Sequence, residues 1–335
     1  MDHLFADAVR QLLADQCTPP RVRDIEAAAT AESAAPLWRQ LEDAGFADAL
    51  VPEDAGGAGL GLAEIYPVLE LCGQYAMPLP LGDTLVARAL LARQGVARPV
   101  GSIALAPNAT LTSQGMQAGH VHHGAVADWV LAQRDKECRL LPGSAADRAP
   151  SVFCLDAVLG WPLAVWEAAP RINPEVDLRI LQACVLAAQL AGALLAVFDR
   201  TLQYANERIQ FGKPIGKLQA IQHQLSVISE HAFAARMAAR IGCHCADLLP
   251  QRLRVAVAKA RTGEAAVEVA ALAHAIHGAI GFTAEFDLQL YTRRLHAWRH
   301  AAGSESFWHD VVGAMLLERQ DDPALDLIRD ASDIH

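Results

Sequence analysis

The sequence predicts a mainly α-helical protein with a small β domain in its middle, and three observations indicate this fold class. Residues 180–198 are almost continuously apolar and rich in alanine, as in a helix that is buried on all sides. Residues 96–178 alternate apolar and polar side chains between many turn residues, which is typical of short strands. After position 217, apolar residues recur at spacings of three and four, which places them on one helix face. These residues are Leu218, Ile221, Leu225, Ile228 and Ala232.

The composition indicates a large buried core and contacts between subunits. The chain has 335 residues, of which 53% are hydrophobic and 20% are charged. A chain of this length can bury a large core and is expected to form two or three subdomains. The formal net charge of −10 argues against a nucleic-acid surface and against charge-driven binding to anionic membranes.

The N-terminus and the cysteines favour a protein of the reducing cytoplasm. The first residues, MDHLFADAVRQLLADQ, lack a basic region followed by an apolar run, so no export signal is expected. The chain has seven cysteines, and Cys72, Cys154 and Cys184 are predicted to be small buried core residues. Cys243 and Cys245 do not have the spacing of a zinc site, so no metal is predicted.

Residues 1–95 are predicted to form an N-terminal helical domain. An amphipathic run that ends near Gly45 contains Leu37, Trp38, Leu41, Ala44 and Phe46. Glycines follow at positions 56, 57, 59 and 61, without the Gly-Lys-Ser or Gly-Lys-Thr sequence of a phosphate-binding loop. A loop between helices is therefore favoured.

Residues 96–178 are predicted to form a reduced β domain. Its predicted strands include the segments SIALAP, DWVLAQ, CRLLP and SVFCLD. Trp129 and Trp161 lie in this region and are predicted to pack in its hydrophobic core.

Residues 179–335 are predicted to form a C-terminal helical bundle. Gln182 and Gln189 interrupt the first apolar segment, so a buried helix of a bundle is favoured over a membrane span. Further helices are predicted over roughly 217–248, 251–277 and 285–300, with a turn at 278–282 and a last helix from Ser304. Helices with such short connections are typical of a four-helix bundle.

A rigid turn is predicted between the first two helices of the bundle. Gly212, Pro214 and Gly216 interrupt the helical pattern, and proline fixes its own backbone angle while glycine permits unusual ones. The surrounding segment is ERIQFGKPIGKLQAIQHQL. It resembles the signature of the acyl-CoA dehydrogenase flavoprotein family, an Arg-x-x-Phe-Gly turn followed by a Gln-rich helix.

Two further segments carry the same resemblance. VPEDAGGAGL is similar to a loop of the family's N-terminal domain, and HAIHGAIGF is similar to its Gln-x-x-Gly-Gly-x-Gly-(Phe/Tyr) turn. The matching residues around the second turn are Gly278, Gly281, Phe282, Glu285 and Arg293. The resemblance implies the family fold, in which a helical domain, a β domain and a four-helix bundle follow one another.

The resemblance also implies FAD bound across a dimer interface. In the family, the two turns of one subunit reach the pyrophosphate and adenosine of the neighbour's FAD. The implied contacts here are Arg208, Gln210, Phe211, Gly278, Ala279 and Ser304. A guanidinium such as that of Arg208 offers a planar fork to pyrophosphate oxygens. Without the resemblance, an ion pair of Arg208 with Glu207 or another surface acid is the favoured interpretation.

The chain departs from the family where the proton acceptor is expected. Family members remove the α proton of the thioester with a glutamate, which stands at one of two positions. Ala302 and Gln182 occupy these positions here, and neither side chain can act as a base. Glu305 is the nearest substitute, although an acid that complements the helix dipole after Ser304 is its favoured role.

Other family features are also missing, and the losses together lead to a hypothesis with two alternatives. Ala275 and Ala279 replace a glutamine and a glycine of the second turn, and the Thr-Glu-Pro-x-x-Gly-Ser-Asp loop is not found. The chain thus resembles the short, non-catalytic subunit of α2β2 acyl-CoA dehydrogenases, known examples of which act on steroid CoA thioesters. The resemblance implies an acyl-CoA substrate and a longer partner subunit or a homodimer or tetramer, with electron-transfer flavoprotein as a candidate partner, and it leaves the electron acceptor open. The alternatives are a self-sufficient enzyme with Glu305 as base and a flavin-free structural or binding paralogue.

Overall fold

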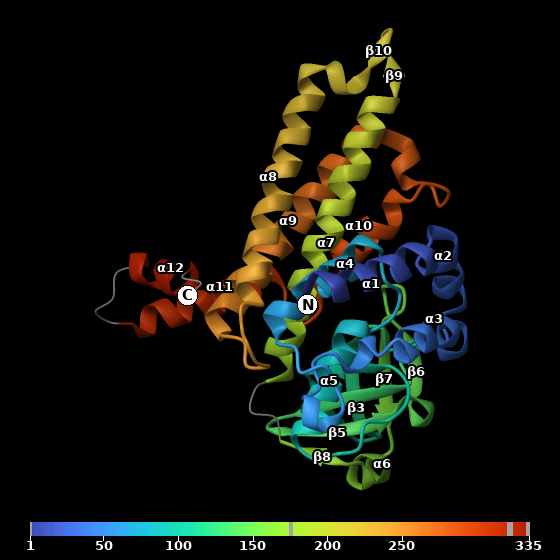
Figure 1. Cartoon of the computed structure of the whole chain (residues 1–335), viewed down its shortest axis with the longest axis vertical. Helices are drawn as coiled ribbons and strands as arrows, with labels where there is room; N and C mark the ends of the chain where they lie inside the picture. The colour runs from blue at the N-terminus through green and yellow to red at the C-terminus, as the bar shows by residue number, and fades with distance from the viewer. Residues whose placement is uncertain (1, 174–176, 320–323, 333–335) are drawn as a thin grey trace. The chain divides into compact units, whose positions relative to one another are not determined.

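The computed structural model describes residues 2–173, 177–319 and 324–332. They form two compact units. The first comprises Met1–Val68, Met77–Val185 and Cys245–Pro250, and the second comprises Leu69–Ala76, Leu186–His244 and Gln251–His335. The mainly helical architecture with a small β region agrees with the predicted fold class (Figure 1). The division into domains over 1–95, 96–178 and 179–335 stays a prediction.

The first unit begins with three helices, α1 (Asp2–Gln16), α2 (Pro19–Ala28) and α3 (Ala31–Asp43). The Thr30 hydroxyl accepts a hydrogen bond from the backbone N–H of Ser33 and caps α3. The predicted amphipathic run lies on α3, where Leu37, Trp38 and Leu41 are buried. Short 3-10 turns, η1 (Phe46–Asp48) and η2 (Glu53–Ala55), then lead through the glycine-containing loop to α4 (Leu62–Gln74) and α5 (Leu81–Arg93).

Two four-stranded sheets follow α5 in the first unit. One has the order β1 (Ile103–Ala106), β4 (Trp129–Arg134), β5 (Glu137–Pro142), β8 (Arg171–Ile172), and only β1 and β4 pair in parallel. The other is antiparallel, in the order β2 (Ala109–Thr112), β3 (Gly115–Val121), β7 (Ala157–Trp161), β6 (Asp147–Pro150).

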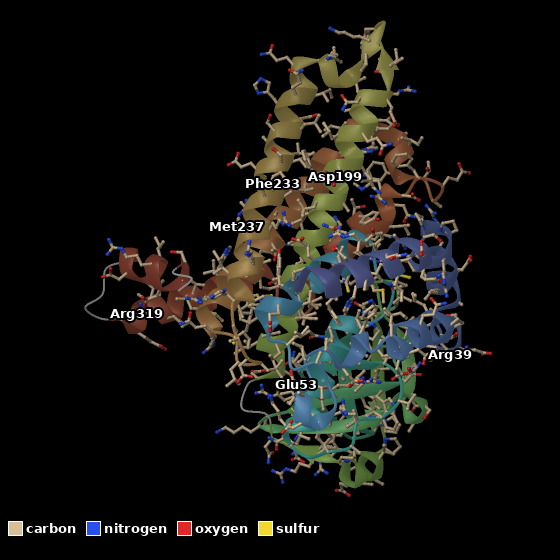
Figure 2. The ribbon with its side chains drawn as sticks, in the orientation of Figure 1. Arg39, Glu53, Asp199, Phe233, Met237 and Arg319 are labelled. Atoms are coloured by element: carbon tan, nitrogen blue, oxygen red, sulfur yellow. The ribbon has the colours of Figure 1, made fainter. Side chains whose placement is uncertain are left out.

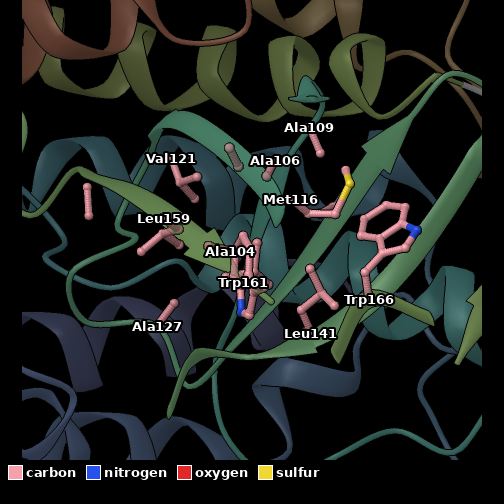
Figure 3. Packing of buried hydrophobic residues seen from close by; sticks show 14 of the residues in the cluster. Ala104, Ala106, Ala109, Met116, Val121, Ala127, Leu141, Leu159, Trp161 and Trp166 are labelled. Carbon is pink, nitrogen blue, oxygen red and sulfur yellow. The ribbon is translucent and has the colours of Figure 1, made fainter. Parts of the chain in front are cut away.

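Small apolar side chains from both sheets fill a common core (Figure 3). Alanines from β1, β2, β3, β4 and β7 contribute to it, and Met116, Trp161 and Trp166 fill the larger gaps. Trp166 comes from α6 (Leu163–Ala168). Trp161 is only 2% exposed, as predicted for a core residue. Trp129 is half-buried instead, because its indole N–H reaches out to the Val100 carbonyl at 3.0 Å.

One predicted strand of this region is wrong. The segment SVFCLD, residues 151–156, forms bends and a turn, and Leu155 adopts a left-handed conformation with φ of 69°. Such a conformation interrupts the extended backbone that a strand requires. Cys154 is consequently exposed, contrary to the prediction, whereas Cys72 and Cys184 are buried as predicted. The strands β2, β3 and β7 were missed by the pattern.

Two polar side chains of α5 bind the free edge of β1. The Asp83 carboxylate accepts the N–H of Leu105 at 3.0 Å, and the Thr84 hydroxyl accepts that of Ile103 at 2.8 Å. Both side chains are almost fully buried. They satisfy strand donors that would otherwise be buried without partners, which explains polar residues on a buried helix.

The second unit is the predicted helical bundle. Its long helices are α7 (Leu178–Glu207, the first residues of which belong to the first unit), α8 (Gln219–Gly242), α9 (Arg252–His277) and α10 (Leu288–His300). They are followed by α11 (Glu305–Glu318) and α12 (Ala324–Ser332). Gly192 lets α7 approach the end of α4 closely, since a Cβ there would lie 1.8 Å from the Glu70 carbonyl oxygen.

Two features of the helices bear on the predictions. α8 ends at Gly242 rather than near residue 248, and beyond it the Asp247 carboxylate bonds its neighbouring backbone N–H, a local contact that competes with helix. α7 and the stretch Arg252–Phe282 are long and apolar enough to cross a membrane, but the apolar window of α7 is 94% buried within the protein. Phe233 and Met237 lie on α8 and are about half exposed (Figure 2).

A candidate cofactor-binding elbow

The rigid turn predicted after Arg208 is a β-hairpin at the end of α7. Strand β9 (Ile209–Gln210) pairs with β10 (Lys213–Pro214), and the hairpin stands at the tip of the α7–α8 pair (Figure 1). Its two central residues, Phe211 and Gly212, both have positive φ, at 54° and 75°. Positive φ at both positions is the hallmark of a type I′ hairpin turn, which fits the twist of the flanking strands.

The side chains of this hairpin point into solvent rather than into their own fold. Arg208 and Gln210 are exposed, and Phe211 is 86% exposed. Glu207 accepts a hydrogen bond from Gln203 at 2.7 Å and is not paired with Arg208. Within the part of the chain that the structure describes, the Arg208 guanidinium forms no ion pair or hydrogen bond. The surface ion pair considered as an alternative is therefore not formed by these residues.

The glycine turn after α9 is a 3-10 turn, η5 (Gly278–Phe282), with equally exposed residues. Gly278 has φ of 67° and ψ of −145°, a backbone conformation that essentially only glycine adopts. Gly278, Ala279 and Ala275 are exposed, and Phe282 is 70% exposed. Gly281 is buried and packs against His277. A Cβ at position 281 would lie only 3.0 Å from the Cβ of His277. At Gly278 and Ala279 the turn thus presents backbone with little side chain to the surface, whereas Ile280 and Phe282 add exposed apolar side chains.

A stack of aromatic rings joins the hairpin to the glycine turn. The Tyr204 ring stacks on the His277 ring with centroids 4.3 Å apart, and the Tyr204 hydroxyl donates to the His277 carbonyl at 3.3 Å. Tyr204 lies one helical turn before Arg208, and His277 directly precedes Gly278. Five of the six predicted cofactor contacts therefore gather at one end of the bundle, which we call the elbow end. These are Arg208, Gln210, Phe211, Gly278 and Ala279.

The sixth predicted contact, Ser304, lies in a loop at the opposite end of α9, which we call the loop end. The Lys259 ammonium on α9 donates to the carbonyls of Arg299 at 2.8 Å and Gly303 at 2.9 Å. Lys259 and His277 are five turns of the same helix apart, about 27 Å at 1.5 Å per residue. The structure therefore does not bring Ser304 together with the elbow residues of the same chain.

The loop end is closed by contacts within the chain. Ala302 and Gly303 have positive φ of 57° and 105°, and the Trp308 indole N–H donates to the Ala302 carbonyl at 3.2 Å. The Ser304 hydroxyl caps α11 by accepting the N–H of Phe307 at 3.5 Å. Ala302 is predicted to stand at the position of the family's glutamate, a correspondence that stays a prediction, and its methyl group offers no proton acceptor.

Glu305 is held in an ion pair, as the first residue of α11. Both of its carboxylate oxygens accept from the Arg299 guanidinium, and Gly263 of α9 leaves the room for it. Partial burial raises the pKa of Glu305, but the hydrogen bond and charge of Arg299, a backbone hydrogen bond and His300 together outweigh it, so the pKa is lowered overall. A carboxylate with a lowered pKa and a fixed partner is a poor proton acceptor.

Gln182, which is predicted to stand at the family's second position for the base, is bound to groups of the fold. Gln182 is 2% exposed, and its amide nitrogen donates to the Asp83 carboxylate at 3.1 Å and to the Leu105 carbonyl at 3.0 Å. The sequence pattern did not single out Asp83. The hydrogen bond from Gln182 places the Asp83 carboxyl beside α7, and burial raises the pKa of this carboxyl to about 6.

Comparison with known proteins covers nearly the whole chain. Residues 2–96 match the acyl-CoA dehydrogenase N-terminal domain, and residues 181–317 match the acyl-CoA dehydrogenase C-terminal domain. The acyl-CoA dehydrogenase IpdE2 of Mycobacterium tuberculosis is 31% identical over 297 residues, which are 88% of this chain and 90% of that protein. The chain belongs to the acyl-CoA dehydrogenase family. The family's members are FAD-dependent oxidoreductases that act on CH–CH bonds, and the resemblance noted in the sequence is confirmed.

Solved structures of the family share the fold. The ChsE4–ChsE5 complex of Mycobacterium tuberculosis contains a chain with a TM-score of 0.82 and 23% identity, covering 96% of this chain and 98% of that one. A chain of the Tcur3481–Tcur3483 steroid ACAD has a TM-score of 0.78 and 23% identity, covering 96% of this chain and 99% of that one. At this level of identity the likeness concerns the fold, and it confirms the predicted helical and β architecture.

The residues of the elbow end suit the dinucleotide that the family binds. A guanidinium that has no partner among the described residues, exposed backbone at Gly278 and Ala279, and an exposed aromatic ring are suited to bind a pyrophosphate and its flanking groups. The loop end does not suit it in this way, because its ammonium, guanidinium and indole donors already bind groups of the chain. Across residues 2–173, 177–319 and 324–332, no group of three or more metal-binding side chains is present.

Proposed function

We propose that this chain is the partner subunit of a heteromeric acyl-CoA dehydrogenase, to which it contributes an FAD-contacting elbow but no proton acceptor. The exposed, unpaired Arg208 guanidinium on a rigid hairpin is the observation that supports this most strongly. A charge held without a partner by ordered backbone is preorganised for a ligand of opposite charge. The proposed assembly is α2β2 and cytoplasmic, with electron-transfer flavoprotein as its electron acceptor.

The elbow residues have distinct roles in this proposal. Arg208 binds the pyrophosphate through its planar fork, and Gln210 donates to the phosphate or ribitol region. Phe211 packs beside the flavin chain, and Gly278 and Ala279 let their backbone approach the dinucleotide closely. FAD, when bound, is the hydride acceptor for the β carbon of an acyl-CoA thioester, whereas this chain contributes binding and orientation.

The proton acceptor is proposed to come from the other subunit. The Ala302 methyl group cannot accept a proton, the Gln182 amide donates to Asp83 and to the Leu105 carbonyl, and Glu305 is engaged by Arg299. The names of the two structural neighbours, each a pair of proteins, support a heteromer. The steroid ACAD among them supports a bulky acyl-CoA, such as a steroid thioester, as the substrate class.

A self-sufficient dehydrogenase with a relocated base is the second candidate. The observation in its favour is Asp83, a buried carboxyl with a raised pKa beside Gln182. Against it, the Asp83 carboxylate accepts two hydrogen bonds that tie α5 to β1 and α7. The test is whether the purified chain alone oxidises acyl-CoA. If it does, and if Asp83→Asn or Glu305→Gln abolishes this activity, the second candidate is established and the heteromer is excluded.

A flavin-free paralogue is the third candidate, suggested by Ala275 and Ala279. The test is to tag this chain in its native host, purify the assembly and measure its flavin absorbance and subunit composition. We expect a second, longer acyl-CoA dehydrogenase subunit and bound FAD.

Arg208→Ala should lower the FAD affinity by about thirtyfold, since a charge-assisted bond to phosphate contributes roughly 1.5–3 kcal/mol.

A matched arginine controls this measurement. Arg240 is exposed near the other end of α8, and Arg240→Ala should leave the FAD affinity unchanged. An assembly without FAD, or one whose FAD affinity does not change in Arg208→Ala, contradicts the proposed function.

A further inference from the structure

A dinucleotide bound by both turns of the elbow end requires that the turns keep a fixed spacing. Arg208 follows α7, whereas Gly278 follows α9, so the two halves of the proposed site come from segments far apart in the sequence. Binding groups act together only when they are held within roughly 0.5 Å of the productive geometry. Some contact of the fold must therefore fix the hairpin against the glycine turn.

We infer that Tyr204 is the positioning residue that fixes these two halves against each other, an inference that rests on the proposed function. Its ring stacks on His277 at 4.3 Å with an interplanar angle of 22°, and its hydroxyl donates to the His277 carbonyl at 3.3 Å. Phe286 packs edge-on against Tyr204 at 6.0 Å and tilted against His277 at 5.2 Å. Ring and hydroxyl together fix both the distance and the rotation of the turn.

The far side of this contact is itself immobilised. The His277 ring donates through Nδ1 to the Ala273 carbonyl at 2.7 Å, and burial lowers the pKa of His277, so the ring stays neutral. The His277 carbonyl, which accepts from Tyr204, is one of the last carbonyls of α9. The last carbonyls of a helix have no hydrogen-bond partner within the helix. Gly278 follows immediately, so the Tyr204 hydroxyl holds the backbone at the point where the turn begins.

On α7, one turn of helix links Tyr204 to the Arg208 guanidinium. The backbone N–H of Arg208 donates to the Tyr204 carbonyl at 2.8 Å, and the Arg208 carbonyl accepts from Ile215 at 2.8 Å. A movement of Tyr204 is thus transmitted to the base of the hairpin. Tyr204 does not reach solvent as Arg208 does, and its side chain acts through these neighbours.

Two substitutions separate the two parts of the contact. Tyr204→Phe removes the hydroxyl bond and keeps the stack, and we expect the FAD affinity of the tagged assembly to fall about fivefold. Tyr204→Leu removes the stack as well, and we expect a fall of about thirtyfold. In the chain alone, both variants should speed amide hydrogen exchange at 278–283 and 208–214, and leave exchange in the middle of α8 unchanged.

A second tyrosine of the same unit provides the matched control. The Tyr291 hydroxyl donates to the Gln74 carbonyl at 3.1 Å, a bond of the same kind outside the elbow end. Tyr291→Phe should change neither the FAD affinity nor exchange in the two turns. If Tyr204→Leu fails to fold, Tyr204→Phe carries the test, since it retains the ring.

The outcomes distinguish this inference from the proposed function. Unchanged exchange in the turns of Tyr204→Phe and Tyr204→Leu overturns the positioning role, whatever FAD does. Faster exchange with unchanged FAD affinity also overturns it, provided that Arg208→Ala weakens FAD binding in the same assay. If Arg208→Ala has no effect either, the proposed function has failed, and the positioning role fails with it.

Discussion

The two ends of the bundle differ in how their polar groups are used. At the elbow end, Arg208 and Gln210 are exposed on an ordered hairpin, and Phe211 is 86% exposed. At the loop end, the fully buried Lys259 donates to the Arg299 and Gly303 carbonyls, and the Arg299 guanidinium is paired with Glu305. One end leaves its charge without an internal partner, whereas the other end neutralises its charges within the fold.

This difference separates charges that bind a ligand from charges that stabilise the fold. A charge that stabilises the fold is paired and desolvated, so its removal lowers the free energy of unfolding. A charge that serves a ligand is held in place without a partner, so its removal leaves the fold intact. The comparison is therefore tested by measuring unfolding and FAD binding side by side in the same variants.

The largest effect on stability is expected from Lys259→Ala. The substitution leaves two carbonyls without their donor and opens a cavity beneath the loop end, and we expect a loss of about 3 kcal/mol. Urea unfolding of the purified chain measures it. Lys217 is an exposed lysine of the 3-10 turn after the hairpin, and Lys217→Ala should change stability by less than about 0.5 kcal/mol. Equal stability of Lys259→Ala and the wild type would remove the distinction between the two ends.

The same lysine should make stability depend on pH. Burial lowers the pKa of Lys259 to about 7, while Glu305 raises it and Arg299 lowers it further. Between pH 7 and pH 9 the unfolded chain keeps this lysine protonated, whereas the folded chain loses the proton. The unfolded state then binds more protons, so the free energy of unfolding should rise with pH, by up to about 1 kcal/mol per unit.

The Lys259→Met variant serves as the control for this pH dependence. The methionine retains most of the volume and has no proton to lose, so the slope between pH 7 and pH 9 should disappear. Above pH 9 the buried Cys138 thiol opposes the trend, since its pKa is raised to about 12 by burial and the unfolded thiol ionises first. If the free energy of unfolding still rises between pH 7 and pH 9 in Lys259→Met, the pH dependence does not come from Lys259.

A smaller loss is expected from Glu305→Gln. The ion pair with Arg299 is about one-fifth exposed on both sides, and we expect a loss of about 1 kcal/mol. Dehydrogenation by the intact assembly should be retained, because Glu305 belongs to the fold. Loss of turnover with unchanged stability would instead make Glu305 the proton acceptor.

The sequence predicted the fold well where one physical signal was sufficient. The apolar segment at 180–198 and the spacing of Leu225, Ile228 and Ala232 correctly placed buried helix faces. Strands were harder to predict, because β2 is short, β3 and β7 lack a regular alternation of apolar and polar residues, and β3 pairs with β7 far along the chain. Residues 151–156 show the reverse case, since their apolar pattern is interrupted by the left-handed backbone at Leu155.

The candidate site could be predicted only in part. The local sequence singled out Arg208, Gln210 and Phe211, which are exposed on the hairpin, whereas their contact with FAD and the absence of a base at Ala302 stay predictions. The contacts of Tyr204 with His277 and of Gln182 with Asp83 join residues far apart in the sequence, and no local spacing reveals them. The separation of Ser304 from the elbow likewise follows from the length of α9.

The smallest effect on stability is expected at the tip of the hairpin. Phe211 has φ of 54° ahead of Gly212, a conformation in which asparagine is favoured over bulky residues. Phe211→Asn should therefore leave the free energy of unfolding unchanged or raise it by a few tenths of a kcal/mol. FAD retention by the tagged assembly should fall, because the exposed ring is lost. Phe211 opposes the local preference of its own turn, which a ligand outside this chain would explain. If Phe211→Asn is destabilised yet keeps its FAD, the ring belongs to the fold instead.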